Sequence, residues 1–152
     1  MNANIATKAN EYYKHFPDYL KSKLLDGTVK LPTHTLFKYS QILAYRCISR
    51  QINDNTPFNI YDMRSYYEEG KRPRGRIIDD NDPFLYSVSL FKNLNELKNI
   101  LKFPRPQKKI AKGYIYQEGG PQYSDSYNSH INWWLFKNVN FDSFIIMENL
   151  NE

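Results

Sequence analysis

The first quarter of the chain has apolar residues at helical spacing. From Ile5 to Phe16 the residues favour helix, and the proline that follows ends this segment. Asp18 then has the position of an N-cap for a second helix over Tyr19–Leu25, whose leucines fall on one face, and Gly27 fits its C-terminal end. We therefore expect a helical N-terminal region over about residues 1–30.

Farther along, short segments rich in β-branched and aromatic residues are separated by turn residues. This composition is typical of strands in a sheet. The segments that we expect to be strands are Gln41–Ser49, Phe84–Leu90, Ile110–Gln117, His130–Lys137 and Ser143–Glu148. A short Asn-rich turn separates the last two, and it predicts a hairpin.

Two further helices are expected between the strands. One is Tyr61–Glu69, which ends at Gly70, and the other runs from Asn93, as its cap, to Leu101. Because helices and strands do not alternate regularly, the pattern predicts an α+β fold with a mixed, mostly antiparallel sheet and helices at its sides. A length of 152 residues suits a single domain over 1–152.

Composition bears on where the protein is located in the cell and on the kind of genome that encodes it. No apolar run approaches the roughly 20 residues that span a bilayer, and the first residues lack the apolar core of a secretory signal. We therefore expect a protein with no membrane partner that is cytoplasmic, or else exported by a route that reads no such signal. Abundant Asn, Lys, Ile and Tyr point to an AT-rich genome, and hence to a bacterium, a phage or another mobile element.

Metal chemistry is not expected. The chain has one cysteine, Cys47, which we place in the core, and three dispersed histidines. No cluster has zinc-binding spacing, so we expect no metal site.

The net charge of +5 is concentrated in one stretch. Between Arg64 and Arg76 the basic residues outnumber the acidic ones, and Arg72, Arg74 and Arg76 lie on a loop that contains Pro and Gly. Such a loop is either a solvated charged surface or a site that grips phosphates of a nucleic acid or another anion.

A buried arginine is expected on the strand Gln41–Ser49. Its alternation places Arg46 on an otherwise apolar face with Ile42, Ala44 and Ile48. Since desolvating a guanidinium is costly, Arg46 requires an anion or several hydrogen-bond acceptors there.

Two serines lie on one face of the strand that leads into the helix after Asn93. Ser87 and Ser89 are spaced i, i+2, so both hydroxyls can hold an amide or a ribose of a ligand, with Tyr86 beside them. The alternative is the exposed face of an edge strand.

The order of these features resembles the ADP-ribosyltransferase-like fold over roughly residues 44–122. The resemblance implies that Arg46, Ser87 and Ser89 hold NAD, from which ADP-ribose is transferred to a protein or nucleic-acid target. Val88 stands where the family has Thr. The resemblance also implies that Arg46→Ala abolishes activity without unfolding the chain.

The family also has a catalytic Glu on a later strand. Glu118 and Glu148 compete for this role, with Glu148 preferred because it ends the last expected strand. His130, at the start of a strand, is a further candidate as acid or base in the pocket.

Two other functions remain open. The chain could be a non-catalytic phage or mobile-element protein that inhibits a host complex or binds nucleic acid through its basic loop. It could also be an RNA-cleaving toxin that uses His130 with an Arg or a Tyr.

Overall fold

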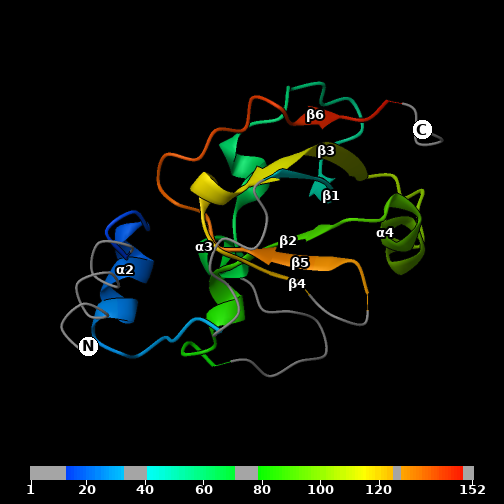
Figure 1. The fold of residues 1–152 in the computed structure, drawn as a ribbon. Helices are drawn as coiled ribbons and strands as arrows, with labels where there is room; N and C mark the ends of the chain where they lie inside the picture. Colours follow the sequence, from blue (N-terminus) through cyan, green and yellow to red (C-terminus); the bar gives the residue numbers. More distant parts are fainter. Residues whose placement is uncertain (1–12, 33–40, 71–78, 125–127, 149–152) are drawn as a thin grey trace.

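The computed structural model describes residues 13–32, 41–70, 79–124 and 128–148 (Figure 1). The helices are α2 (Asp18–Leu25), α3 (Tyr66–Glu69) and α4 (Leu94–Leu101), with 3-10 turns η1 (Ile60–Met63), η2 (Pro83–Tyr86) and η3 (Gln117–Gly119). The strands are β1 (Gln41–Ser49), β2 (Val88–Phe91), β3 (Lys108–Tyr116), β4 (Gln122–Ser124), β5 (His130–Trp133) and β6 (Ile145–Ile146).

All six strands form one sheet in the order β4-β5-β2-β1-β3-β6, and every neighbouring pair is antiparallel. The predicted α+β class with an antiparallel sheet is thereby confirmed. β1 and β3 pair along their whole length, from Gln41 opposite Tyr116 to Ser49 opposite Lys108. By contrast, β1 and β2 are in register at a single pair, Tyr45 and Phe91.

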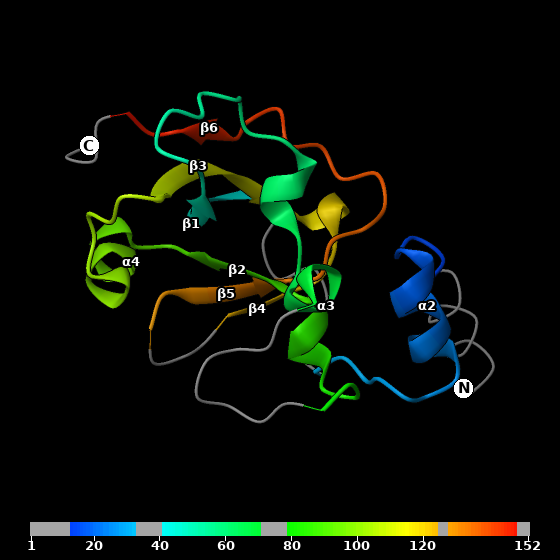
Figure 2. The same ribbon diagram turned by 180° about the vertical axis from the view of Figure 1, so that it is seen from behind.

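This single pair divides the sheet into two halves. Figure 1 shows β6, β3 and β1 in one group and β2, β5 and β4 in another. The helices α2 and α4 lie at opposite ends of the molecule, and the view from behind shows α3 between them (Figure 2). The sheet therefore separates beside the Tyr45–Phe91 pair.

Three hydrophobic clusters pack against the sheet. The first joins α2 to Leu85, Tyr86 and Trp134, and the second fills the space between the two halves of the sheet around Trp133. The third packs Leu97 of α4 against β1 and β3. The apolar face of α4 thus covers the end of the sheet at which β1 and β2 meet.

Two elements match their sequence prediction closely. β1 has the predicted bounds, and its alternate residues enter different clusters, with Ala44 in one and Tyr45 and Cys47 in another. Asn93 caps α4 by accepting a hydrogen bond from Glu96 N at 3.0 Å. Strand propensity and a side-chain cap are local signals, so sequence reasoning recovered both.

The predicted strand Phe84–Leu90 is wrong in its first half. Pro83 begins the 3-10 turn η2, and the Asp82 side chain accepts a hydrogen bond from Phe84 N at 2.9 Å. A proline at the first position and a capping aspartate favour a helical turn over a strand. Ser87 therefore lies at the end of a turn, and only Ser89 lies within β2.

The predicted helix Tyr61–Glu69 is divided into η1 and α3. Ser65 caps α3 with its side chain, and Glu68 Oε1 accepts a hydrogen bond from Ser65 N at 3.1 Å. This reciprocal pair starts a new helix, so the backbone of Arg64 is extended.

The C-terminal strands are shorter than predicted and do not form a hairpin. β5 ends at Trp133 and pairs with β2 and β4, whereas β6 consists of Ile145–Ile146 and pairs with β3 at the opposite edge of the sheet. The predicted strand Ile110–Gln117 is shifted to Lys108–Tyr116. Sheet order is set by contacts between distant residues, which short apolar runs do not encode.

At the N-terminus, Pro17 rather than Asp18 occupies the N-cap of α2. Gly27 follows the C-cap with a φ of 81°, as a helix end requires. Of the predicted helix Ile5–Phe16, only residues 13–16 are among those described. Within the described ranges, no helix has the length and apolar character needed to cross a membrane.

Candidate functional site

Arg46 spans the point at which the two halves of the sheet separate. It follows Tyr45 of the bridging pair, and its Nη1 donates to Ser89 O of β2 at 2.9 Å. Its Nε donates to Asp62 O at 2.8 Å and its Nη2 to Arg64 O at 3.3 Å. One guanidinium therefore ties β1 to β2, to η1 and to the segment between η1 and α3.

These contacts explain how a cation is tolerated at this position. Backbone carbonyls replace water around the Arg46 guanidinium, which agrees with the expectation of several acceptors. Burial lowers the pKa of Arg46, and the charge of Glu69 opposes that effect. Arginine stays protonated at neutral pH. Because backbone carbonyls accept hydrogen bonds from several N–H groups of the Arg46 guanidinium, only its remaining N–H groups can reach a ligand.

The serines and His130 form a polar surface next to Arg46. Ser89 Oγ and His130 Nε2 share a hydrogen bond at 2.9 Å, whose direction depends on the histidine tautomer. Ser87 Oγ lies 3.0 Å from both Phe84 O and Asn132 Oδ1, to which it can donate. The Ser87 hydroxyl is thus used within the protein, whereas Ser89 and His130 form the more accessible pair.

A cavity of about 420 Å³ opens over these groups, and we call it the Arg46 cavity. It receives side chains from β1, β2, β3, β5, α3, α4 and the segment that leads into α3. Those used below are Arg46, Cys47, Arg64, Glu69, Ser87, Ser89, Lys108 and His130. Ligand sites commonly have volumes of about 300–1,000 Å³. The structure thus brings four of the residues selected from the sequence to one cavity.

The charges in the Arg46 cavity favour an anionic ligand. Arg46, Arg64 and Lys108 are cationic, and Glu69 is the carboxylate among the lining residues. Lys108 Nζ donates to Ser49 Oγ at 2.7 Å, which leaves other ammonium N–H groups for a ligand. The three cationic side chains outnumber the carboxylate, so the lining carries a net positive charge.

Sequence reasoning missed Glu69, because the family pattern directs attention to a later strand. Glu69 is the last residue of α3, and Gly70 after it ends the helix with a φ of 68°. The Ser65–Glu68 capping box fixes the other end of the same short helix. This Ser-x-x-Glu pattern followed by Gly is the sequence signal that could have revealed a rigid position for Glu69.

The two carboxylates selected from the sequence lie elsewhere. Glu118, in η3, lines a separate cavity with His15 and Lys137. Glu148 follows β6 and lines another cavity beside Phe144. Both residues are exposed, and the Arg46 cavity does not include them.

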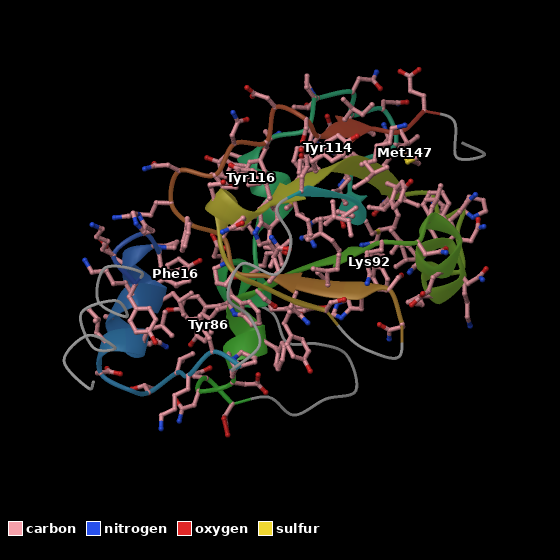
Figure 3. All side chains as sticks on the ribbon, viewed as in Figure 1. Phe16, Tyr86, Lys92, Tyr114, Tyr116 and Met147 are labelled. Carbon is pink, nitrogen blue, oxygen red and sulfur yellow. The ribbon has the colours of Figure 1, made fainter. Side chains whose placement is uncertain are left out.

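Tyr86 also lies outside the Arg46 cavity. Its hydroxyl donates to Asp80 O at 2.6 Å and accepts from Lys23 Nζ at 2.8 Å. Figure 3 shows Tyr86 near α2, at the end of the molecule away from α4. Because η2 replaces the predicted strand, Tyr86 belongs to the cluster around α2.

The described residues do not include the basic loop that the sequence predicts to bind anions. Arg72, Arg74 and Arg76 lie outside the described residues, so their role stays a prediction. Tyr66, which precedes that loop, is 37% exposed and lines the Arg46 cavity.

Cys47 lies in the Arg46 cavity wall and packs in the cluster around α4. Burial raises the pKa of its thiol, and the nearby charges of Lys108 and Arg46 act in the opposite direction. The thiol is therefore mainly neutral at physiological pH.

Neither metal ligands nor known relatives identify the site. Among the described residues, no group of His, Cys, Asp and Glu side chains could hold a metal ion. Comparisons with protein-family models, with curated proteins and with solved structures gave no match to this chain.

Proposed function

We propose that this chain is an ADP-ribosyltransferase-like protein that binds NAD in the Arg46 cavity and transfers ADP-ribose to a protein or nucleic acid. The observation that supports this proposal is the meeting of Arg46, Ser89 and His130 at one cavity between the halves of the sheet. These residues come from β1, β2 and β5, which are distant in the sequence.

The lining residues fit the parts of NAD. A diphosphate requires cations and N–H donors, which Arg64, Lys108 and the remaining N–H groups of Arg46 supply. A ribose requires groups that both donate and accept hydrogen bonds, and the Ser89–His130 pair is of that kind. In α4, Ile100 lines the cavity and is 56% exposed, so it offers an apolar surface for a ring.

The transfer chemistry assigns a role to Glu69. The bond between C1′ of the ribose and the nicotinamide nitrogen breaks, and its electron pair stays on the nicotinamide, which leaves as a neutral molecule. An acceptor oxygen or nitrogen forms the new bond to C1′ and loses its proton. Glu69 is the carboxylate placed at this cavity, where its charge can stabilise positive charge on the ribose or accept that proton.

Release of nicotinamide from labelled NAD, in the presence of cell extract as a source of acceptors, tests this function. We expect release and label transfer by the wild type. Glu69→Gln should reduce the rate at least about hundredfold, the lower range for loss of an acid–base group. Glu118→Gln and Glu148→Gln are matched controls, since both remove a Glu that lies elsewhere, and they should retain the rate.

Two outcomes would overturn the proposal. One is the absence of nicotinamide release with every extract tried. The other is equal activity of Glu69→Gln and the wild type together with loss of activity in Glu148→Gln, because catalysis would then occur at a different cavity.

A further inference from the structure

A second cavity adjoins the Arg46 cavity, and we call it the Tyr61 cavity. It has a volume of about 450 Å³, and its lining includes Arg50, Asn59, Tyr61 and Asp62. Ser49, Arg64 and Lys108 line both cavities. A molecule in the Tyr61 cavity would therefore be adjacent to a ligand in the Arg46 cavity, with shared cations between them.

Arg50 provides a buried hydrogen-bond donor in the wall of the Tyr61 cavity. Its side chain is 8% exposed, and its Nη2 forms a 2.7 Å ion pair with Asp62 Oδ2. Its Nε has no hydrogen-bond partner among the described residues. A buried N–H without an acceptor is costly, and a ligand oxygen that approached it would remove that cost.

Tyr61 lines the same cavity and has an exposed ring. The side chain is 72% exposed, and the Arg64 guanidinium lies over the ring, 5.7 Å from its centroid. The neighbouring Ile60 is 58% exposed. An aromatic ring held open to solvent beside a cation is the arrangement on which unpaired bases stack.

The charges select an anionic ligand. Asp62 accepts from Arg50 and from Asn59 N, and Asp54 accepts from Thr56 Oγ1 and pairs with Arg50. The carboxylates of the Tyr61 cavity are thus engaged within the protein. Arg64 and Lys108 remain at the junction, in a chain with a net charge of +5.

We propose that the Tyr61 cavity binds single-stranded nucleic acid, with a base stacked on Tyr61 and phosphates at Arg64 and Lys108. The binding site stands on the observations above. Its consequence, that the bound nucleic acid is the acceptor of ADP-ribose, rests on the proposed function. In that step an oxygen or nitrogen of the nucleotide forms the bond to C1′ and gives up its proton, and nicotinamide leaves.

Binding of a fluorescent oligothymidylate or oligouridylate of about 12 nucleotides, without NAD and at low salt, tests the site directly. We expect the wild type to bind and Tyr61→Ala to bind about tenfold more weakly, whereas Tyr61→Phe retains the affinity. Tyr114→Ala is the matched control, because Tyr114 is 42% exposed and lines neither cavity. Arg64→Gln should reduce the slope of log affinity against log salt by about one.

The proposal is overturned if the wild type does not bind either oligonucleotide, or if Tyr61→Ala and Tyr114→Ala bind as the wild type does. Tighter binding of a polyglutamate peptide than of the oligonucleotides would also overturn it, since the surface would then be selective for an acidic peptide.

The binding assay contains no NAD, so it separates this inference from the proposed function. Oligonucleotide binding without any NAD cleavage would support the nucleic-acid site at the Tyr61 cavity and contradict the proposed transferase activity. NAD cleavage with label found on proteins alone would support the transferase activity and contradict a nucleic-acid acceptor.

Discussion

Arg46 and Ser89 are joined by a hydrogen bond of 2.9 Å from Nη1 to the carbonyl oxygen, at the point where β1 and β2 stop pairing. A side chain thereby supplies a link that the backbone ladder does not. The same guanidinium also binds the carbonyls of Asp62 and Arg64, so Arg46 supports the cavity as well as lining it.

Arg46→Ala should therefore destabilise the protein, by about 2–4 kcal/mol, because it leaves partly buried carbonyls without a donor. This revises the expectation, drawn from the sequence resemblance, of a variant that loses activity without unfolding. Urea denaturation followed by tryptophan fluorescence measures the effect. Arg105→Ala, which removes an exposed arginine, is the control. Equal stability of the two variants would contradict the bracing role.

Ser65→Ala should lower the free energy of unfolding by about 1 kcal/mol, the usual cost of losing an N-cap side chain. Ser65 is 1% exposed and caps α3, which ends at Glu69. The same denaturation experiment measures the change. Ser22→Ala is the comparison, because Ser22 is exposed within α2 and should change stability little. A Ser65→Ala variant as stable as Ser22→Ala would show that the cap contributes nothing.

Cys47 should react slowly with a thiol reagent, and its rate should rise with pH above the range of an ordinary thiol. The thiolate is the reactive form, and burial raises the pKa of Cys47. Because the pKa of Cys47 is raised in the folded state, the stability that this group contributes is fully present below its pKa in the unfolded chain. That stability is lost as the pH rises through its pKa in the folded protein. Cys47 is the chain's one cysteine, so the absorbance of the product that a thiol reagent releases measures the reaction of Cys47 alone.

NAD should slow this reaction further, because Cys47 lies in the wall of the Arg46 cavity. A reaction as fast as that of the urea-unfolded chain, or a rate that NAD leaves unchanged at saturation, would count against this placement. The reaction needs no acceptor, so it tests occupancy of the cavity apart from catalysis.

Gly120→Ala should destabilise the protein by about 3 kcal/mol or more. Gly120 has a φ of 130°, and a Cβ there would overlap the carbonyl oxygen of Trp134. Gly27→Ala is the control, with a φ of 81° and open space around the added carbon, and should cost about 1–2 kcal/mol. The melting temperatures of the two variants provide the comparison, and similar values would contradict the close approach of the two segments.

The sequence predicted those features whose causes are local. β1 follows from a run of strand-forming residues, and α4 follows from the Asn93 cap and its apolar face. Local signals also allowed Arg46, Ser89 and His130 to be selected as site candidates. Their meeting at one cavity depends on the order of strands in the sheet, which is set by contacts between distant residues.

The remaining parts of the site were missed for identifiable reasons. Tyr86 lies away from the Arg46 cavity because Asp82 and Pro83 start the turn η2, a local signal that competes with the strand-forming residues after it. Glu69 was overlooked because it lies on an early, very short helix that folds over the cavity. The extended Arg64 backbone between η1 and α3, which brings both Arg64 and Glu69 to the cavity, depends on the Ser65 cap.

Calorimetric titration of NAD into the wild-type protein tests the central claim most directly. We predict one binding site per chain, with affinity weakened at least about tenfold by Ser89→Ala, which removes the hydroxyl bonded to His130 and adds no bulk to the cavity. Saturable binding with that loss supports NAD as the ligand of the Arg46 cavity. The absence of binding at millimolar NAD, or an affinity that Ser89→Ala leaves unchanged, would contradict it.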